Sequence, residues 1–505
     1  MRHKRRDPAS DLPSVRQWAN QAFSRASGAP LREGNRVTLL KDAAENYPAW
    51  LNAIRVAQRT IHFEMYIVHE DEQGQLFADA LLRKAGEGVR VRLLYDWMGG
   101  FGKTSRRFWN RLRSGGVDVR CYNPPRFDHP LGWLSRDHRK TITVDGAVAF
   151  VTGLCVGRMW AGDPARHLEP WRDTGIEVHG PAVLDVEAAF AEAWSAAGDP
   201  LPDERARDMA AHAGDVPLRV VATVPNTAGL FRVDQLVAAM ARQTLWLTDA
   251  YYGGTAPYVE ALRAAARDGV DVRLLVPGAS DLPLIQPFSR AGYRPLLEGG
   301  VRVYEWNGSM LHAKTAVADT RWARVGSTNL NIASWLGNRE LDVIIEHEPV
   351  ARQMEEMFLR DLSNATEVVL RRNRVRAPGA PPERRQSASS GSSSGGRMVA
   401  GAVRVGNTVA AAIANTRVLE SVEANIAVIA GAMLAALAVV SFKYPRALAY
   451  PVGVVALWLA AAILYRGIDL YRNTRNADDV AADGQRSTPR TPASNGYRDP
   501  PTRDK

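Results

Sequence analysis

The sequence is poor in cysteine. Only two of its 505 residues are cysteines, Cys121 and Cys155. Two cysteines cannot form a disulfide framework or a four-cysteine zinc site, so the chain fits a reducing compartment. No cluster of metal-ligand residues stands out in the sequence, which therefore gives no reason to expect a metal or a cofactor.

The N-terminal region also lacks a long apolar run. The basic start MRHKRRDPAS is not followed by an apolar stretch of signal-peptide length, so we expect the N-terminal domain to stay on the side of the membrane where it is made. Basic residues, by contrast, are in excess, with 64 Lys and Arg against 54 Asp and Glu. This balance suits an anionic partner, which could be nucleic acid, an anionic membrane or a phosphate-bearing substrate.

The long central part of the chain alternates β-rich runs with Ala/Leu/Arg-rich helical runs, a pattern typical of α/β proteins. This part repeats itself at an offset of about 180 residues. The strand-like run at 59–68 corresponds to that at 243–252, and the Gly-Gly-Val segment at 114–123 corresponds to that at 298–307. We therefore predict two similar α/β halves, each a mixed sheet flanked by helices, with a functional site at their seam.

Changes in composition predict the boundaries of six segments. They are a basic N-terminal arm (1–31), a first half (32–215), a second half (216–372), a flexible linker (373–397), a membrane region (398–470) and a disordered tail (471–505).

The membrane region contains two uncharged apolar runs, at about 425–442 and 447–465. About 17 to 20 apolar residues are enough to cross a bilayer core, so we predict a transmembrane hairpin; two buried core helices are the alternative. More Arg residues flank the outer ends of these runs than Lys and Arg residues occupy the turn between them. This asymmetry predicts that the two α/β halves and the tail face the cytoplasm.

Two motifs of the form HxKxxxxD occupy equivalent positions in the two repeats. The first comprises His138, Lys140 and Asp145, and the second comprises His312, Lys314 and Asp319. In a strand, His and Lys two residues apart point to the same face, where an imidazole and a cation can address one phosphate group. With Lys and Asp each at about 6% of residues, two such motifs arise by chance on the order of once in a thousand sequences of this composition.

A histidine that attacks phosphorus must be neutral and held in one tautomer, and a carboxylate bonded to its second ring nitrogen achieves both. Asp173 and Glu340 follow His138 and His312 at comparable distances along the chain, and we assign them this role.

Further polar residues follow the second motif. Ser327 and Asn329 are candidates to donate hydrogen bonds to phosphate oxygens. Asp145 and Asp319 are candidates for the catalytic set, although the alternative is that they brace the loop after each strand.

The paired motifs resemble the phospholipase D superfamily, and the text around them is similar to the bacterial cardiolipin synthases. The similar stretches include IHFEMYIVHEDEQGQLFADALL, HRKTITVDGAVAFVTGL, WRDTGIEVHGPAV and GSTNLNIASWLGNRE, within about 32–372. Many cardiolipin synthases place two transmembrane helices before the catalytic region; their absence here resembles the B-type branch. One departure is Cys155, where the superfamily usually has the Asn that the second repeat keeps as Asn329.

This resemblance implies phosphatidyl transfer through a phosphohistidine, with no metal and no cofactor. By analogy, His138 is the nucleophile, His312 is the general acid and base, and Lys140 and Lys314 stabilise the phosphoryl oxygens. The implied donor and acceptor are both phosphatidylglycerol, with glycerol released; phosphatidylethanolamine is a further anionic-membrane lipid to consider. The implied location is the cytoplasmic side of the bacterial inner membrane.

Three alternative hypotheses for the function remain. A phospholipase D-type hydrolase, or a phosphatidyltransferase with another alcohol acceptor, would use the same motifs. A nuclease of the superfamily is disfavoured because the paired apolar runs indicate a lipid substrate, so no nucleic acid partner is expected. A membrane scaffold without chemistry is disfavoured because His138, Lys140, His312 and Lys314 are all intact.

Overall fold

The computed structural model describes residues 15–125, 134–202, 211–282, 285–370, 416–419, 437–444 and 449–458, together with 435, 446, 460, 461 and 464. The first unit of the chain carries both halves and all the strands, and the second contains residues 125–133 and 433–505. The predicted linker and tail, most of the predicted membrane region, and residues 126–133 lie outside the described residues.

The first half follows an N-terminal helix, α1 (Val15–Ser27). Its elements, in chain order, are β1 (Arg32–Lys41), α2 (Asp42–Val56), β2 (Thr60–Met65), α3 (Glu72–Gly86), β3 (Arg90–Asp96), α4 (Trp97–Gly100), α5 (Arg106–Ser114), β4 (Asp118–Tyr122), β5 (Lys140–Val144), β6 (Val148–Thr152), α6 (Arg158–Ala161), the 3-10 turn η3 (Pro164–Arg166), β7 (Thr174–His179) and α7 (Val183–Ala196).

The second half repeats this order of strands. Its elements are β8 (Val216–Thr223), α8 (Gly229–Met240), β9 (Thr244–Thr248), α9 (Ala256–Arg267), β10 (Asp271–Pro277), α10 (Ile285–Ala291), α11 (Tyr293–Glu298), β11 (Arg302–Trp306), β12 (Thr315–Ala318), β13 (Trp322–Gly326), the π turn η4 (Ala333–Gly337), β14 (Glu340–Ile345), α12 (Glu348–Leu362) and β15 (Ala365–Leu370), followed by β16 (Thr416–Leu419).

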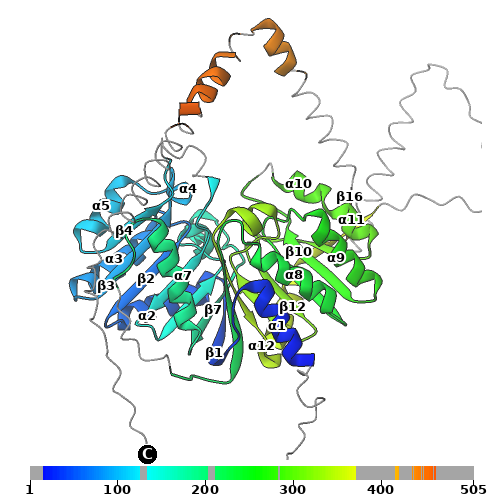
Figure 1. The fold of residues 1–505 in the computed structure, drawn as a ribbon, viewed down its shortest axis with the longest axis horizontal. Coiled ribbons are helices and arrows are strands. Elements are labelled where there is room, and N and C mark those ends of the chain that lie inside the picture. Colours follow the sequence, from blue (N-terminus) through cyan, green and yellow to red (C-terminus); the bar gives the residue numbers. More distant parts are fainter. Residues whose placement is uncertain are drawn as a thin grey trace, which may run out of the picture. The chain divides into compact units, whose positions relative to one another are not determined.

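The sheet order confirms the predicted repeat (Figure 1). From the seam outward, the first half runs β1-β7-β6-β5-β2-β3-β4 and the second runs β8-β14-β13-β12-β9-β10-β11, then β15-β16. In each half, three strands are parallel and the strands nearer the seam are antiparallel, as in β2, β3 and β4 against β5, β6 and β7. Each half is thus a mixed sheet, as the sequence predicts.

The two half-sheets meet where β1 changes partner. Its first residues pair with β8, with Asn35 opposite Val216, and its later residues pair with β7. The change occurs around Gly34, which has a φ of 83° and lies so close to the ring of His212 that a Cβ would sit 2.7 Å from it. Only glycine adopts this backbone conformation without strain, so Gly34 permits the bend that links the halves.

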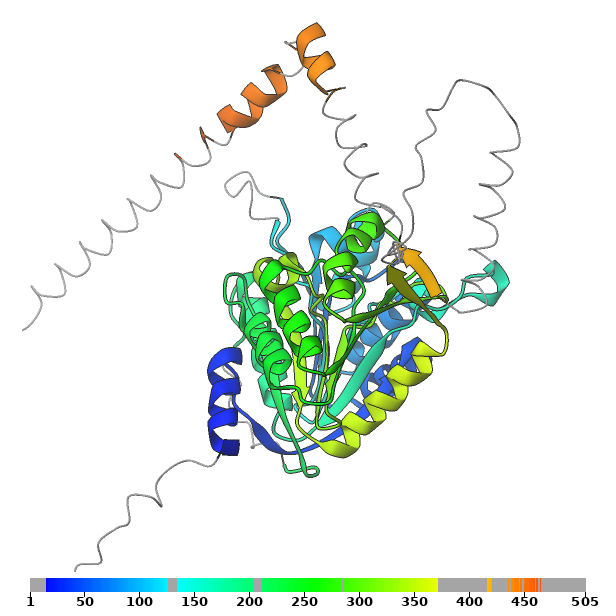
Figure 2. The same cartoon turned by 90° about the vertical axis from the view of Figure 1, so that its right-hand side faces the viewer.

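Each half has its own hydrophobic core, and a third core joins them. Trp50, Phe63 and Phe77 belong to the first core, whereas the third combines strands of both halves with α7 and α12. Helix α1 packs on α8 of the second half, although it precedes the first half in sequence. Figure 2 shows α1 and α12 on opposite sides of the second half.

The alternation of apolar residues in β2 predicts one buried face, but the structure buries both. Helix α7 covers the second face, where the ring of His62 stacks on Phe190 with centroids 4.6 Å apart. The predicted strand is confirmed, and its polar residues face a second layer of helix instead of water.

Candidate active site

Both predicted motifs begin at the same edge of the sheets. His138 and His312 immediately precede β5 and β12, at the edge where the parallel strands of each half end. We call this the motif edge. The backbone N–H of His138 donates to the carbonyl of Arg339 at 2.9 Å, and that of His312 donates to the carbonyl of Arg172 at 2.7 Å. Each motif therefore starts with a backbone hydrogen bond to the other half.

These cross-half bonds determine how the histidines pair with carboxylates. Nδ1 of His138 lies 2.8 Å from Oε2 of Glu340, and Nδ1 of His312 lies 2.7 Å from Oδ2 of Asp173. Chain order places each carboxylate behind the histidine of its own half, but in space each one contacts the histidine of the opposite half. The site therefore requires both halves, because neither half alone contains a complete histidine–carboxylate pair.

The histidines and carboxylates have complementary charge states. Burial lowers the pKa of both histidines, that of His312 to about 3. Burial by itself raises the pKa of Asp173 and Glu340, but attraction and hydrogen bonding to the histidines, together with the lysines, outweigh it and the net pKa is lowered. Ionised carboxylates beside neutral imidazoles require the proton on Nδ1, which leaves the lone pair of each Nε2 free for chemistry.

The two lysines are held in equivalent ways. Nζ of each donates to the carbonyl oxygen of the histidine two residues earlier in its own motif. Nζ of Lys140 lies 5.1 Å from the ring centre of Tyr66, and Nζ of Lys314 lies 5.8 Å from that of Tyr251. Burial lowers the pKa of both lysines, that of Lys314 to about 8. With a pKa of about 8, Lys314 is still mostly cationic at neutral pH and supplies positive charge inside a buried site.

The sequence analysis did not single out the aromatic residues that surround the histidines. Trp160, Trp171 and Tyr251 lie around His312, with ring centroids 5.8, 5.5 and 5.9 Å from the imidazole. His138 has Tyr66 at 4.9 Å. The tyrosines follow the strands β2 and β9, so their position at the motif edge was available from the repeat. Trp160 lies in the short helix α6 and Trp171 in the irregular segment before β7, and neither carried such a signal.

Ser327 and Asn329 occupy different positions from each other within the site. The hydroxyl of Ser327 donates to Oε2 of Glu340 at 2.6 Å, so it orients the carboxylate and its proton is not free for a phosphate. Asn329 is buried, and its Oδ1 has no hydrogen-bond partner among the described residues. The free atom is a hydrogen-bond acceptor, so donation from Asn329 to a phosphate oxygen stays a prediction, whereas the hydroxyl of Ser327 contacts Glu340.

The first half differs at both equivalent positions. Gly153 stands where the second half has Ser327, and a Cβ there would lie 2.2 Å from Oδ1 of Asp173. Cys155 stands in place of Asn329, is buried, and has a thiol whose pKa is raised by burial. The two halves therefore surround the shared site with similar backbones but different polar groups.

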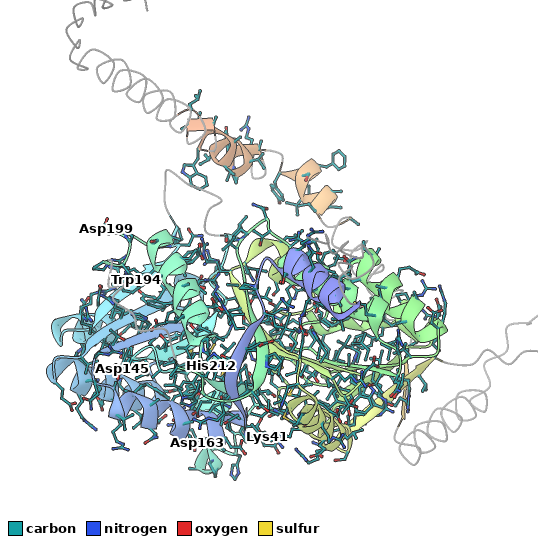
Figure 3. The ribbon with its side chains drawn as sticks, turned by 60° about the horizontal axis from the view of Figure 1, so that its bottom comes forward. Lys41, Asp145, Asp163, Trp194, Asp199 and His212 are labelled. Atoms are coloured by element: carbon teal, nitrogen blue, oxygen red, sulfur yellow. The ribbon has the colours of Figure 1, made fainter. Side chains whose placement is uncertain are left out.

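Asp145 and Asp319 lie at the opposite end of their strands from the histidines, Asp145 at the position labelled in Figure 3. The carboxylate of Asp145 accepts hydrogen bonds from the backbone N–H groups of Gln58, Arg59 and Thr60. Asp319 accepts three equivalent bonds from residues 242–244. Their inclusion in the catalytic set is therefore corrected, and the bracing alternative describes their contacts.

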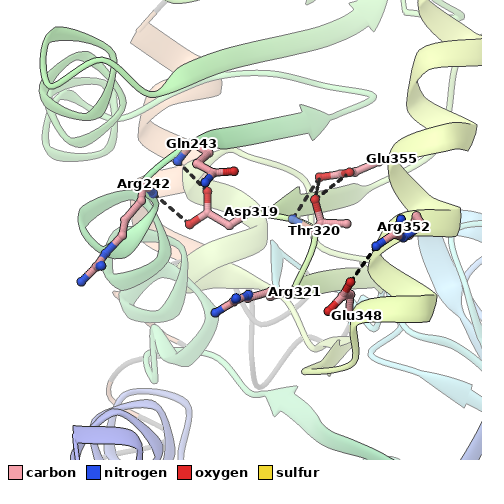
Figure 4. Close-up of a pocket in the computed structure, with 8 residues that line it drawn as sticks. All are labelled: Arg242, Gln243, Asp319, Thr320, Arg321, Glu348, Arg352 and Glu355. Atoms are coloured by element: carbon pink, nitrogen blue, oxygen red, sulfur yellow. Dashed lines mark hydrogen bonds and ion pairs between the residues drawn. The ribbon is translucent and has the colours of Figure 1, made fainter.

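A cavity of about 500 Å³ also lies at that opposite end of the second half (Figure 4). It is lined by Arg242, Gln243, Asp319, Thr320, Arg321, Glu348, Arg352 and Glu355. Its carboxylates are occupied, since Glu355 accepts from Thr320 and Glu348 pairs with Arg352. Separately, no group of three or more His, Cys, Asp and Glu in the described part of the chain could hold a metal ion.

Comparison with known proteins agrees with this geometry. The family profile described as "Cardiolipin synthase, PLD-like domain" matches residues 50–156 and 237–362, which contain both motifs. The cardiolipin synthase of Halalkalibacterium halodurans is 31% identical over 362 residues, covering 70% of this chain and 71% of that protein. Cardiolipin synthase A of Pseudomonas fluorescens is 33% identical over 358 residues, covering 69% and 73%.

A solved structure supports the fold. Phosphatidylserine synthase of Haemophilus influenzae superposes with a TM-score of 0.56 at 14% identity, covering 70% of this chain and 92% of that one. This likeness extends across both halves of the described fold, and the sequence matches supply the family. The chain therefore belongs to the cardiolipin synthase family of the phospholipase D superfamily.

Proposed function

We propose that the chain makes cardiolipin by transferring a phosphatidyl group from one phosphatidylglycerol to a second and releasing glycerol. The observation that carries this proposal is the buried pair of histidines, each with a free Nε2, an ionised carboxylate from the opposite half and a lysine beside it. This set supplies a nucleophile, a proton carrier and positive charge to one phosphodiester.

In the proposed first step, Nε2 of His138 attacks the phosphorus of the donor lipid. The N–P bond forms while the P–O bond to the headgroup glycerol breaks, and protonated His312 gives its proton to the departing oxygen. Because burial lowers the pKa of free His312 to about 3, we propose that the bound phosphodiester anion raises it enough for the ring to be protonated. Lys140 and Lys314 stabilise the phosphoryl oxygens.

In the second step, a hydroxyl of the acceptor phosphatidylglycerol attacks the phosphohistidine. His312 takes the proton of this hydroxyl, the new P–O bond forms, and the N–P bond breaks to return neutral His138. Glu340 holds the His138 ring in place, because it is bonded to Nδ1, the ring nitrogen that takes no part in the proposed attack.

Transfer to an alcohol, as opposed to hydrolysis, requires that water be kept from the intermediate. The side chains of His138 and His312 are only 11% and 6% exposed, and three aromatic rings surround His312. This shielding favours transfer to a lipid alcohol over hydrolysis to phosphatidic acid.

We further propose that residues 425–442 and 447–465 form the membrane hairpin that keeps the catalytic region at the cytoplasmic face of the inner membrane. Residues 437–443 and 449–458 are helical, and their apolar side chains are largely uncovered, with Phe442 88% and Leu457 73% exposed. Within the described residues, no helix combines the length and the apolar character needed to cross a bilayer.

The test uses purified full-length protein in liposomes with phosphatidylglycerol labelled in its headgroup glycerol, beside His138→Ala. We expect cardiolipin and free labelled glycerol from the wild type, and neither from the variant. Phosphatidic acid as the sole lipid product would replace the synthase with a hydrolase.

The same assay distinguishes the roles of the two histidines. With phosphatidylglycerol labelled on phosphorus and an alkaline quench, which preserves phosphohistidine, we expect label on the peptide containing residue 138. His312→Ala would remove turnover, and label at residue 312 in the wild type would reverse the assignment.

A further inference from the structure

The motif edge carries exposed apolar side chains on both halves. Phe101, in the loop after α4, is 65% exposed, and Leu134, just before the first motif, is 58% exposed. On the second half, Phe288 in α10 is 67% exposed and Ile332, between β13 and η4, is 58% exposed. Isolated exposed apolar residues are ordinary on protein surfaces, but their collection at one edge requires a cause.

The topology explains why these residues share an edge. Strands β3 and β10 run parallel to β2 and β9, which end beside the starts of β5 and β12. The segments that follow β3 and β10, which carry Phe101 and Phe288, therefore project at the end where His138 and His312 lie. Figure 1 shows α4 and α10 at the same end of the two halves.

Three cations accompany Phe101. Lys103, Arg106 and Arg107 are all exposed, and in the described structure none of them forms a side-chain hydrogen bond or ion pair. By contrast, Arg111 in the following helix pairs with Asp79, and the half-buried Arg158 pairs with Glu72. The segment 101–107 therefore combines an exposed aromatic side chain with three cations that form no ion pair with any described residue; the one carboxylate among those residues that contacts it, Glu70, accepts from the backbone N–H of Ser105.

We propose that the segment 101–107, together with Phe288 on the facing half, is a docking surface for an anionic lipid bilayer. Aromatic side chains inserted at the headgroup boundary and cations beside them match the two properties of such a surface, its apolar interior and its negative charge. The bilayer is preferred to a second copy of the chain because this segment is cationic and a copy would bring like charge to it. This surface rests on the proposed function, since it brings the motif edge to lipids that are the proposed substrates.

The first test compares vesicle-bound with monomeric substrate for the full-length protein. The variant Lys103→Gln/Arg106→Gln/Arg107→Gln should raise the apparent KM for phosphatidylglycerol in vesicles at least tenfold at low salt, because each cation near an anionic surface contributes about a fivefold change in affinity. Its kcat, and its rate on short-chain phosphatidylglycerol below the micellar concentration, should stay within about twofold of wild type. High salt should abolish the difference in KM.

The matched control removes three exposed arginines from the opposite end of the fold, Arg83→Gln/Arg242→Gln/Arg321→Gln, two of which line the cavity in Figure 4. It should leave the vesicle KM within twofold of wild type. An equal rise in the vesicle KM of both triple variants would show that net charge alone causes the effect, and would overturn the docking surface. An unchanged vesicle KM in both variants would overturn it as well.

A second test does not depend on turnover. An environment-sensitive dye is attached to Phe101→Cys, or to Met240→Cys at the opposite end, in full-length protein reconstituted into nanodiscs. The dye at 101 should be quenched by a lipid-borne quencher in phosphatidylglycerol discs and much less in phosphatidylcholine discs, and the dye at 240 in neither. An unquenched dye at 101 overturns the docking surface even if cardiolipin is made, and quenching without any cardiolipin would retain the surface while the proposed function fails.

Discussion

Lys314 is a buried ammonium group whose charge the proposed chemistry requires. Burial, with a smaller contribution from the charge of nearby Lys140, lowers its pKa to about 8, so the free protein loses this charge as the pH rises through 8. We expect kcat/KM to fall above pH 8, and Lys314→Arg to retain its charge across this range because a guanidinium does not deprotonate there. The measurement is the pH dependence of kcat/KM with short-chain phosphatidylglycerol.

The comparison between Lys314→Arg and wild type uses the shape of the pH profile and not the absolute rate. Lys314→Arg lowers the rate at every pH if the longer side chain fits poorly, but its profile should lack the decline near pH 8. A profile with the same alkaline decline as wild type would assign that decline to another group.

Asn329 and Cys155 occupy equivalent positions but should contribute unequally. The side-chain NH₂ group of an asparagine such as Asn329 donates hydrogen bonds to oxygen acceptors, whereas the thiol of Cys155 is a weak donor. We predict that Asn329→Ala lowers kcat/KM about 100-fold, as expected for loss of one preorganised donor to a phosphoryl oxygen. Cys155→Ala should change kcat/KM less than about threefold, and equal losses in the two variants would contradict this difference.

At the scale of elements, the two ends of β5 and β12 have different roles. We call the end beside the histidine the chemical end, and the end that carries Asp145 or Asp319 the structural end. Asp173 contacts His312 at the chemical end, so Asp173→Asn should lower kcat by about 10² to 10⁴ through loss of the correct tautomer, with little change in Tm. Asp145 accepts three backbone N–H bonds at the structural end, so Asp145→Asn should reduce the free energy of unfolding by about 1–2 kcal/mol.

The pair of variants is informative because the two effects should separate. Activity assays and thermal unfolding are measured on both, with wild type alongside. If Asp145→Asn retained its stability but lost turnover at a temperature where it is folded, Asp145 would return to the catalytic set.

The sequence predicted the repeated strands and the motif residues, because the two repeats keep the same order and spacing along the chain. The expectation that His and Lys of each motif lie together in a strand is wrong, since His138 precedes β5 and both His312 and Lys314 precede β12. It could not predict that Glu340 pairs with His138, because that contact depends on the backbone bond between His138 and Arg339, 201 residues apart in sequence. Trp160 and Trp171 were missed for a related reason, since they reach His312 from the four-residue helix α6 and from an irregular segment, both too short to show a periodic pattern.

At the scale of the whole molecule, the two halves are held together by more than their shared site. The buried guanidinium of Arg139 donates to carbonyl oxygens of Ala189, Thr223 and Glu340, which belong to both halves. Arg219 of the second half binds Asn20 and Ser24 of α1. The segment that precedes the first half in sequence is thereby attached to the second, which favours folding of the two halves as one unit.

The last prediction separates this catalytic unit from the proposed membrane hairpin. A chain ending at residue 424 keeps every strand of the sheet and all the helices of the three cores. It should therefore retain the wild-type Tm and turn over short-chain phosphatidylglycerol within about threefold of the full chain. Membrane fractions washed at high salt and high pH should retain the full chain and release the truncated one, because the remaining attachment through Phe101 and the cations is electrostatic and reversible. If the truncated chain stayed in the washed membranes, residues 425–465 would not be the anchor, and if it lost its fold, those residues would instead belong to the core.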